Sequence, residues 1–403
     1  MMSAKKPLKG PAKPRISPPP APVKVEKTRG LFLLEPGKLE LKEFDVEELF
    51  GHPPRSDMCL VKTAACGICG SDVSYYKGRN PWSLHTLGIN IPSDPNMVLG
   101  HEITGIIADT RGATSEKRKG ERVGIIAYKE CGECIDCLEG NYNLCSHCDH
   151  IGHGETLPDG TKNSWYNHKI VPGGFSDYFT CWHEKLVKLP ESVDMKEATQ
   201  LDGLAVSVHG CNRVGIKKGG SVLVLGTGPI GFMSAQVAAA YGAAHVVVTD
   251  VFDKPFEVLE RIAKGWSGCQ LHCINVRKED PVKTCMALTN NLGVDAVLDT
   301  IGDKTTVIPG IKSLRRGRTM LMYSGFEDTI EFPLTWVSGE RILTSSCNNP
   351  FPDYPAAIDL LATGKVQIKP MITHTFRLEQ YQEAFDVAIN KEAHDSIKVV
   401  IVP

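Results

Sequence analysis

The chain has 403 residues, of which 42% are hydrophobic and 23% charged, and its net charge is −2. This length predicts two to three domains, and the composition excludes a wholly disordered chain, a collagen-like repeat and a small disulfide scaffold. The near-neutral charge provides no global positive field, so we expect neither nucleic acid nor an anionic membrane as a partner.

Residues 1–29 differ sharply in composition from the rest. They carry eight Lys/Arg, one Glu and seven Pro, which gives them a charge of +7 and leaves −9 for the remainder. We expect a flexible basic, Pro-rich tail, because almost no large apolar side chain is present to offset the entropy of ordering it. A transit peptide is the alternative, but such peptides are amphipathic and rich in Arg and Ser. No apolar stretch typical of a secretion signal follows the start, so the expected location is the cytoplasm.

Two short motifs offer metal ligands early in the chain. The first contains Cys66 and Cys69, and the second is Gly100-His101-Glu102. Taken alone, the cysteines could form a redox pair and His101 could be an ordinary core histidine. A thiolate, an imidazole and a carboxylate from separate strand ends, however, are the donors of a catalytic zinc with one open position.

A second cysteine group has the spacing C-x2-C-x2-C-x7-C and consists of Cys131, Cys134, Cys137 and Cys145. Four thiolates so close together can complete a tetrahedral shell, which predicts a closed, structural zinc site. An iron–sulfur cluster and a chance group of free thiols are the alternatives.

Four further candidate ligands follow the cysteine group directly: His147, Cys148, His150 and His153. Because the four positions of a structural zinc are already filled, we interpret these residues as part of a polar surface loop.

The uncharged run from 219 to 249 contains a repeated strand signal. Its opening, Ser221–Leu225, and its close, His245–Asp250, are β-branched and apolar, with small residues between them. Glycines and a proline argue against a membrane helix, and buried parallel strands have this continuous apolar character. The run therefore predicts a βαβ unit, and apolar segments at 294–298 and 319–323 extend the same parallel sheet.

A glycine-rich loop joins the first strand to its helix, with the sequence Gly226-Thr227-Gly228-Pro229-Ile230-Gly231. Glycines at these positions permit a tight turn, a close approach of backbone to a pyrophosphate and close helix packing. Asp250, at the end of the second strand, can accept hydrogen bonds from both ribose hydroxyls and repel a 2′-phosphate. The loop and this carboxylate predict NAD as cofactor, while Lys254 nearby keeps NADP as the alternative.

These motifs, in this order, resemble the zinc-containing medium-chain dehydrogenase/reductase family from about residue 30 to the end. The resemblance implies an α/β fold with a β-barrel: a discontinuous GroES-like catalytic domain and a Rossmann domain with a doubly wound parallel sheet. The implied segments are a catalytic domain at 30–204 with the structural-zinc lobe, an NAD-binding domain at 205–345, and a return to the catalytic domain at 346–403.

The resemblance also implies roles at the catalytic zinc. Cys69 and His101 become ligands, and Glu102 is either a fourth ligand or lies just outside the metal's ligand shell. Asp72 orients the histidine. Ser71 receives the proton of the alcohol.

Two positions depart from the family pattern, and a third matches it but has an alternative role. Asp202 stands where many relatives have a Cys or Glu zinc ligand, and the alternative role is to cap the following helix. Ser74 replaces a histidine that relays protons to solvent in alcohol dehydrogenases. Lys398 lies where relatives have a basic residue facing the cofactor, with an ordinary surface charge as the alternative.

The implied reaction is zinc-assisted transfer of a hydride from a small-molecule alcohol to NAD, with two zinc ions per chain in a homodimer or homotetramer. We expect a secondary hydroxyl in a polyol, cyclitol, sugar or amino alcohol, supported by polar Asn348 and Asn349. A primary alcohol or aldehyde is the alternative, because the long segment 154–174 resembles an insertion of cinnamyl-alcohol-type members. A catalytically silent member and a zinc-free reductase are further alternatives, but zinc-free reductases lack both ligand motifs.

Overall fold

The computed structural model describes residues 25–51, 56–79, 96–115, 118–145, 147–153, 169–324 and 329–403. Most of the expected tail and residues 154–168 of the expected insertion lie outside the described residues. Strand β1 (Lys27–Glu35) pairs with β2 (Lys38–Asp45), so the assignment of residues up to 29 to the tail is wrong at its end. Arg29 is not a free tail charge, because its guanidinium pairs at 2.8 Å with Asp177, 148 residues further along the chain.

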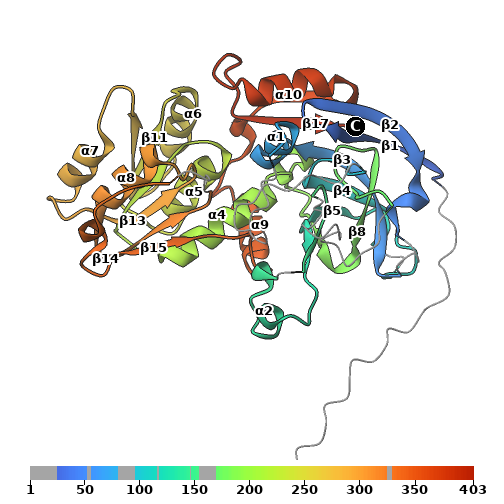
Figure 1. The fold of residues 1–403 in the computed structure, drawn as a ribbon, viewed down its shortest axis with the longest axis horizontal. Coiled ribbons are helices and arrows are strands. Elements are labelled where there is room, and N and C mark those ends of the chain that lie inside the picture. Colours follow the sequence, from blue (N-terminus) through green and yellow to red (C-terminus); the bar gives the residue numbers. More distant parts are fainter. Residues whose placement is uncertain are drawn as a thin grey trace, which may run out of the picture.

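A seven-stranded sheet builds the right-hand half of the molecule in Figure 1. Its strands are β3 (Met58–Gly67), β4 (Glu102–Asp109), β5 (Arg122–Ile125), β8 (Tyr178–Trp182), β9 (Leu186–Lys188), β16 (Ile372–Arg377) and β17 (Lys398–Val402). The order is β16-β17-β3-β4-β5-β9, with β8 also paired to β3, and only the β16–β17 pair is parallel. The inward side chains form one apolar core, which includes Val61, Phe179 and Ile401.

A six-stranded parallel sheet builds the other half. Its strands are β10 (Ser221–Leu225), β11 (His245–Asp250), β12 (Gln270–Asn275), β13 (Val294–Asp299), β14 (Leu314–Met322) and β15 (Ile342–Ser345), in the order β12-β11-β10-β13-β14-β15. All neighbours run parallel, and all five residues of β10 are buried. The continuous apolar strands predicted from the sequence are therefore confirmed as the centre of a parallel sheet.

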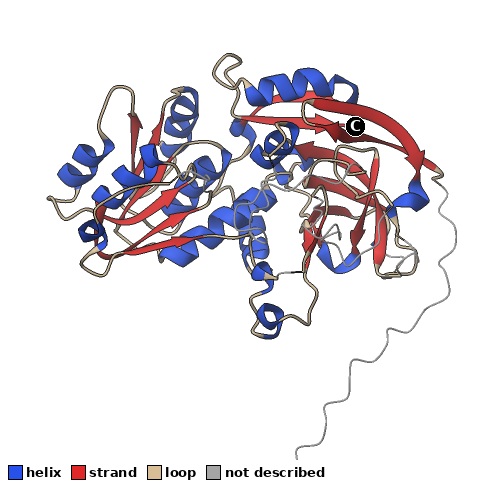
Figure 2. Ribbon diagram, in the orientation of Figure 1, coloured by secondary structure: helices blue, strands red, loops and turns tan. Residues whose placement is uncertain are grey.

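Helices cover both faces of the parallel sheet, as Figure 2 shows. Alternate strand residues point into two separate apolar cores, one shared with α4, α5 and α6 and the other with α7 and α8. These helices are α4 (Leu201–Val214), α5 (Pro229–Ala240), α6 (Lys254–Ala263), α7 (Pro281–Leu288) and α8 (Lys304–Ser313). This arrangement is the predicted doubly wound sheet.

The two halves meet at α4, which packs on α9 (Asp353–Ala362) in a common core. Helix α4 runs without a break through the expected domain boundary between 204 and 205. After α9 the chain enters the first sheet through β16, α10 (Tyr381–Ile389) and β17. The placement of the domain boundaries stays a prediction.

The shorter elements are α1 (Gly70–Tyr76), α2 (Ile135–Leu138), α3 (Met195–Ala198), and the paired strands β6 (Tyr128–Lys129) and β7 (Asp149–His150). In Figure 1 the lobe around α2 projects away from both sheets. Across the described residues, the helices are all too short or too polar to span a bilayer.

Candidate active site and metal centres

The projecting lobe gathers the four cysteines predicted to bind a structural metal. Their sulfur atoms all lie within 4.8 Å of one another, with Sγ–Sγ distances of 3.5 Å for Cys131–Cys145, 3.8 Å for Cys134–Cys145 and 4.0 Å for Cys131–Cys137. Two sulfurs bound to one tetrahedral zinc, each about 2.3 Å from the ion, lie about 3.8 Å apart. The four thiols therefore fit zinc without rearrangement.

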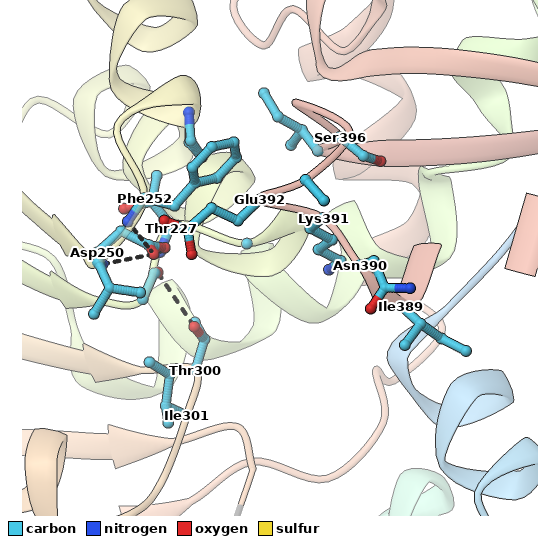
Figure 3. A pocket seen from close by; sticks show the side chains of 16 residues that line it. Thr227, Asp250, Phe252, Thr300, Ile301, Ile389, Asn390, Lys391, Glu392 and Ser396 are labelled. Atoms are coloured by element: carbon cyan, nitrogen blue, oxygen red, sulfur yellow. Dashed lines mark hydrogen bonds between the residues drawn. The ribbon is translucent and has the colours of Figure 1, made fainter. Parts of the chain in front are cut away.

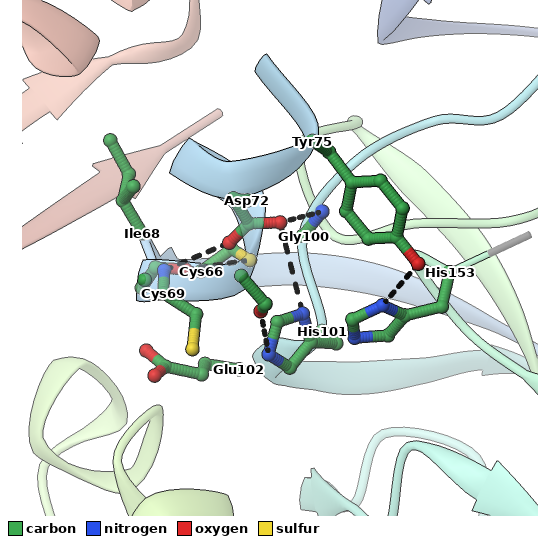
Figure 4. A network of polar contacts seen from close by, with 12 residues as sticks. Cys66, Ile68, Cys69, Asp72, Tyr75, Gly100, His101, Glu102 and His153 are labelled. Atoms are coloured by element: carbon green, nitrogen blue, oxygen red, sulfur yellow. Dashed lines mark hydrogen bonds and ion pairs between the residues drawn. The ribbon is translucent and has the colours of Figure 1, made fainter. Parts of the chain in front are cut away.

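The Asp72 carboxylate holds together the two loops that carry the predicted catalytic ligands (Figure 4). Cys69 precedes α1, and its backbone N–H donates to one oxygen of Asp72 at 2.8 Å. The other oxygen accepts from the N–H of Gly100 at 3.1 Å and lies 3.7 Å from Nδ1 of His101. Asp72 is fully buried, so this single side chain fixes Cys69 relative to His101 as well as facing the imidazole.

His101 lies in a concentration of negative charge. Burial alone would lower the pKa of its imidazole, but Asp72, Cys69 and Asp202 raise it to about 10. Such an environment favours a cation at this position, and a thiolate, an imidazole and a carboxylate are donors that zinc accepts. The types of donor present are therefore those that a catalytic zinc accepts, and their role as ligands stays a prediction.

Glu102 is occupied by protein partners on both of its oxygens. Lys398 Nζ lies 2.7 Å from Oε1 and 2.5 Å from Oε2, and Gln200 Nε2 donates to Oε2 at 2.7 Å. Gly67 provides the space, because a Cβ there would lie 2.1 Å from Oε2 of Glu102. Burial raises the pKa of Glu102, but the charges of Lys398 and His101 outweigh it and lower the pKa. These contacts support a place for Glu102 outside the metal's ligand shell.

The interpretation of Lys398 as a cofactor-facing residue is corrected by the same contacts. Lys398 is 3% exposed, and its ammonium also donates to the carbonyl of Ile68 at 2.8 Å. A buried ammonium needs a carboxylate within reach, and the one within reach is Glu102. Lys398 therefore lies behind the predicted metal site.

Asp202 lies in the first turn of α4, and burial raises the pKa of its carboxyl, although the positive charge of His101 acts in the opposite direction. Among the described residues, the cysteine lobe is the one group of three or more candidate ligands whose atoms all lie within 4.8 Å. Cys69, His101 and Asp202 are thus neighbours that do not meet this limit as a set. The side chain of Asp202 makes no hydrogen bond that caps α4, so the alternative capping role finds no support.

The two serines considered for proton transfer, Ser71 and Ser74, have different hydrogen-bond partners. Ser71 Oγ is 3.4 Å from Nε2 of His101, which brings this hydroxyl to the predicted metal ligands. Ser74 Oγ instead donates to the carbonyl of Gly70 at 3.1 Å, within α1. The role of Ser71 in proton transfer stays a prediction, and the hydroxyl of Ser74 makes a contact within its own helix.

The interpretation of Cys148, His150 and His153 as a surface loop is wrong. They are 4%, 8% and 9% exposed, because β7 pairs with β6 and leads the chain back beneath the metal site. The rings of His153 and His101 lie 4.3 Å apart, and His153 Nδ1 is 3.1 Å from the hydroxyl of Tyr75 (Figure 4). Cys148 Sγ is 3.3 Å from His150 Nε2. Only His147 is exposed.

A cavity of about 790 Å³ lies between the glycine-rich loop and the segment after α10 (Figure 3). One wall includes Gly226, Gly228 and Asp250. The tight loop needs glycine, because a Cβ on Gly231 would lie 1.9 Å from the carbonyl oxygen of Gly226. Pro229, Ile230 and Gly231 form the first turn of α5 behind this wall.

Asp250 is held at the cavity edge by backbone N–H groups of Thr227, Val251 and Phe252, at 2.8, 2.8 and 3.1 Å. The opposite wall, residues 389–393 with Ser396 and Ile397, was not anticipated from the sequence. No local pattern marks it, since it becomes a wall only when α10 and β17 fold against the other sheet.

A doubly wound parallel sheet with a cavity at its glycine-rich loop, together with a second sheet that carries a Cys/His pair, is the arrangement of a zinc-type dehydrogenase. The alcohol dehydrogenase GroES-like domain matches residues 55–191, and the zinc-binding dehydrogenase domain matches residues 229–363. Sorbitol dehydrogenase 2 of Saccharomyces cerevisiae is 32% identical over 341 residues, covering 84% of this chain and 89% of that protein. The chain belongs to the zinc-containing medium-chain dehydrogenase/reductase family.

Solved structures agree with this assignment. An Escherichia coli oxidoreductase/dehydrogenase of unknown specificity superposes with a TM-score of 0.80 at 28% identity, covering 93% of this chain and 99% of that one. A zinc-binding dehydrogenase of Sinorhizobium meliloti bound to NADP gives 0.77 at 26% identity, covering 94% and 99%. The chain is thus a zinc-binding oxidoreductase that acts on a small molecule.

Proposed function

We propose that this chain oxidises a secondary hydroxyl of a polyol, cyclitol, sugar or amino alcohol, with NAD as the hydride acceptor. The observation that carries the proposal is that the side chains of Cys69 and Ser71 both contact His101, in the half of the molecule built on the seven-stranded sheet. The similarity to a sorbitol dehydrogenase supports the polyol class.

The chain's own groups have defined tasks in this proposal. Cys69, His101 and Asp202 would hold the zinc, which would supply the positive charge that lowers the pKa of a substrate hydroxyl toward neutral pH. Ser71 accepts the hydroxyl proton, and Asp72 keeps the His101 ring oriented. Asp250 binds the adenosine ribose of NAD and disfavours a 2′-phosphate.

Asn349 supports a hydroxylated substrate. It is 2% exposed, its Nδ2 is 3.5 Å from the carbonyl of Asp202, and Tyr128 OH fixes its backbone carbonyl at 2.5 Å. Among the described residues, its Oδ1 has no hydrogen-bond partner. A buried acceptor of this kind discriminates strongly in favour of a ligand that brings a hydroxyl donor.

The substrate class is tested by comparing kcat/KM for sorbitol, 2-butanol and cinnamyl alcohol with NAD⁺. We expect sorbitol to be the best of the three. Asn349→Ala should lower kcat/KM for sorbitol by roughly 10-fold or more, with a smaller effect on 2-butanol. Best turnover of cinnamyl alcohol would make the secondary-hydroxyl assignment wrong and leave the zinc and NAD chemistry in place.

We also propose a cytoplasmic homodimer or homotetramer. The structure describes all 14 cysteines and pairs none of them in a disulfide, which suits a reducing compartment. Exposed apolar side chains support a further protein contact: Ile135 and Leu138 on the lobe are 66% and 73% exposed, and Ile342 on edge strand β15 is 55% exposed.

A further inference from the structure

Helix α1 directs three of its side chains toward the predicted ligand His101. Ser71, Asp72 and Tyr75 are spaced at i, i+1 and i+4, which places them on one side of the helix. Ser71 Oγ lies 3.4 Å from Nε2 of His101, and a carboxylate oxygen of Asp72 lies 3.7 Å from Nδ1. The second distance is longer than a hydrogen bond, so Asp72 by itself leaves the imidazole some freedom to rotate.

The third side chain, Tyr75, reaches the imidazole through a second histidine. Tyr75 is fully buried, and its hydroxyl lies 3.1 Å from Nδ1 of His153. The centroid of the His153 ring lies 4.3 Å from that of His101, with 42° between the ring planes. Figure 4 shows these contacts, from Tyr75 on the helix to His153 and on to His101. His153 is therefore a common neighbour of the Tyr75 hydroxyl and the His101 imidazole.

The backbone holds His153 in this place. Gly152 has a φ of 71°, and a Cβ there would lie 2.3 Å from the carbonyl oxygen of Gly100, the residue before His101. The N–H of Gly152 donates to the carbonyl of Pro172 at 2.6 Å. The segments that carry the two histidines thus pack backbone to backbone, and His153, at 9% exposed, has little room to move away.

We propose that Tyr75 and His153 are positioning residues for the predicted zinc ligand His101. The Tyr75 hydroxyl fixes the rotation of the His153 ring, and that ring limits the rotation of the imidazole beside it. A side chain that is already oriented loses less conformational freedom when it binds a metal. This inference rests on the proposed zinc at Cys69 and His101 but not on which alcohol is oxidised.

The test measures zinc affinity, which needs neither substrate nor turnover. The more accessible zinc is removed by a chelator from the unmodified chain, Tyr75→Phe, His153→Ala and the double variant, and zinc is titrated back in competition with a chelating dye. We expect Tyr75→Phe to weaken zinc binding by about 10-fold and His153→Ala by up to about 100-fold. The double variant should match His153→Ala, because the Tyr75 hydroxyl acts through His153.

A spectroscopic measurement and a matched control separate positioning from general damage. With Co²⁺ in place of the accessible zinc, the visible absorption bands depend on ligand geometry and should shift in Tyr75→Phe. His374→Ala removes a ring that stacks on Phe376 in edge strand β16, and should leave the zinc affinity and the cobalt bands unchanged. Zinc retained in the four-cysteine lobe shows that each variant has folded.

Two results would overturn the proposal while the unmodified chain binds its second zinc. One is unchanged zinc affinity in both single variants, and the other is complete loss of the second zinc in His153→Ala, which would make His153 a ligand. Additive losses in the double variant would also contradict an action of Tyr75 through His153. Absence of a second zinc from the unmodified chain would instead overturn the assignment of Cys69 and His101 as ligands, and the positioning role with it.

Discussion

Asp202→Asn is expected to remove most of the dehydrogenase activity while the four-cysteine site keeps its metal. The substitution retains the shape of the side chain but removes the negative charge, which interacts with that of His101. A lost zinc ligand should cost more than the roughly 10–100-fold typical of residues outside the metal's ligand shell. The measurement is kcat/KM together with the zinc content per chain, which should fall from two to one.

Cys131→Ser is the matched control for this experiment. It removes a ligand of the lobe, so it should lower the melting temperature or the yield while the other site still binds zinc, because structural zinc contributes folding free energy. Full activity and two zinc ions per chain in Asp202→Asn would show that Asp202 is not a ligand.

Lys398→Met is expected to lower the free energy of unfolding by about 3–5 kcal/mol, the usual result of leaving one member of a buried ion pair uncompensated. Both side chains of the Lys398–Glu102 pair are at most 5% exposed. Burial lowers the pKa of Lys398, but Glu102 and Cys69 outweigh burial and raise it, as expected of an ammonium that the fold stabilises. Thermal or denaturant unfolding measures the loss.

Two controls define what this loss means. The double variant Lys398→Met with Glu102→Gln removes both charges and should recover much of the stability. Lys27→Met removes an exposed pair with Asp45, and should leave the melting temperature nearly unchanged. A Lys398→Met variant as stable as the unmodified chain would contradict the buried pair.

The features that the sequence predicted well are those encoded locally. The apolar run of β10, the spacing of the four cysteines and the glycines at 226, 228 and 231 each act over a few residues, so their geometry follows from the chain itself. The fold class and the family follow from several such motifs in order. The ligand roles of Cys69, His101 and Asp202 remain predictions.

The errors concern contacts between distant segments. Lys398 and Glu102 are 296 residues apart in the chain, and nothing near either one predicts that they pair. The sequence predicts His153 in a surface loop because the four cysteines already fill a structural zinc site, yet β7 leads the chain back and places its ring beside that of His101. Lys391 likewise faces the cofactor cavity only because α10 and β17 fold against the parallel-sheet half. Such positions depend on how the sheets pack, which residue periodicity does not encode.

The most direct test of the account follows NADH formation from sorbitol before and after selective removal of the more accessible zinc by a chelator. The account predicts that the protein with one remaining zinc per chain loses its activity and regains it when one equivalent of zinc is returned, because the lobe's closed site is not catalytic. Full activity in the one-zinc protein, with the four-cysteine lobe still filled, would contradict the claim that hydride transfer depends on a zinc at Cys69 and His101.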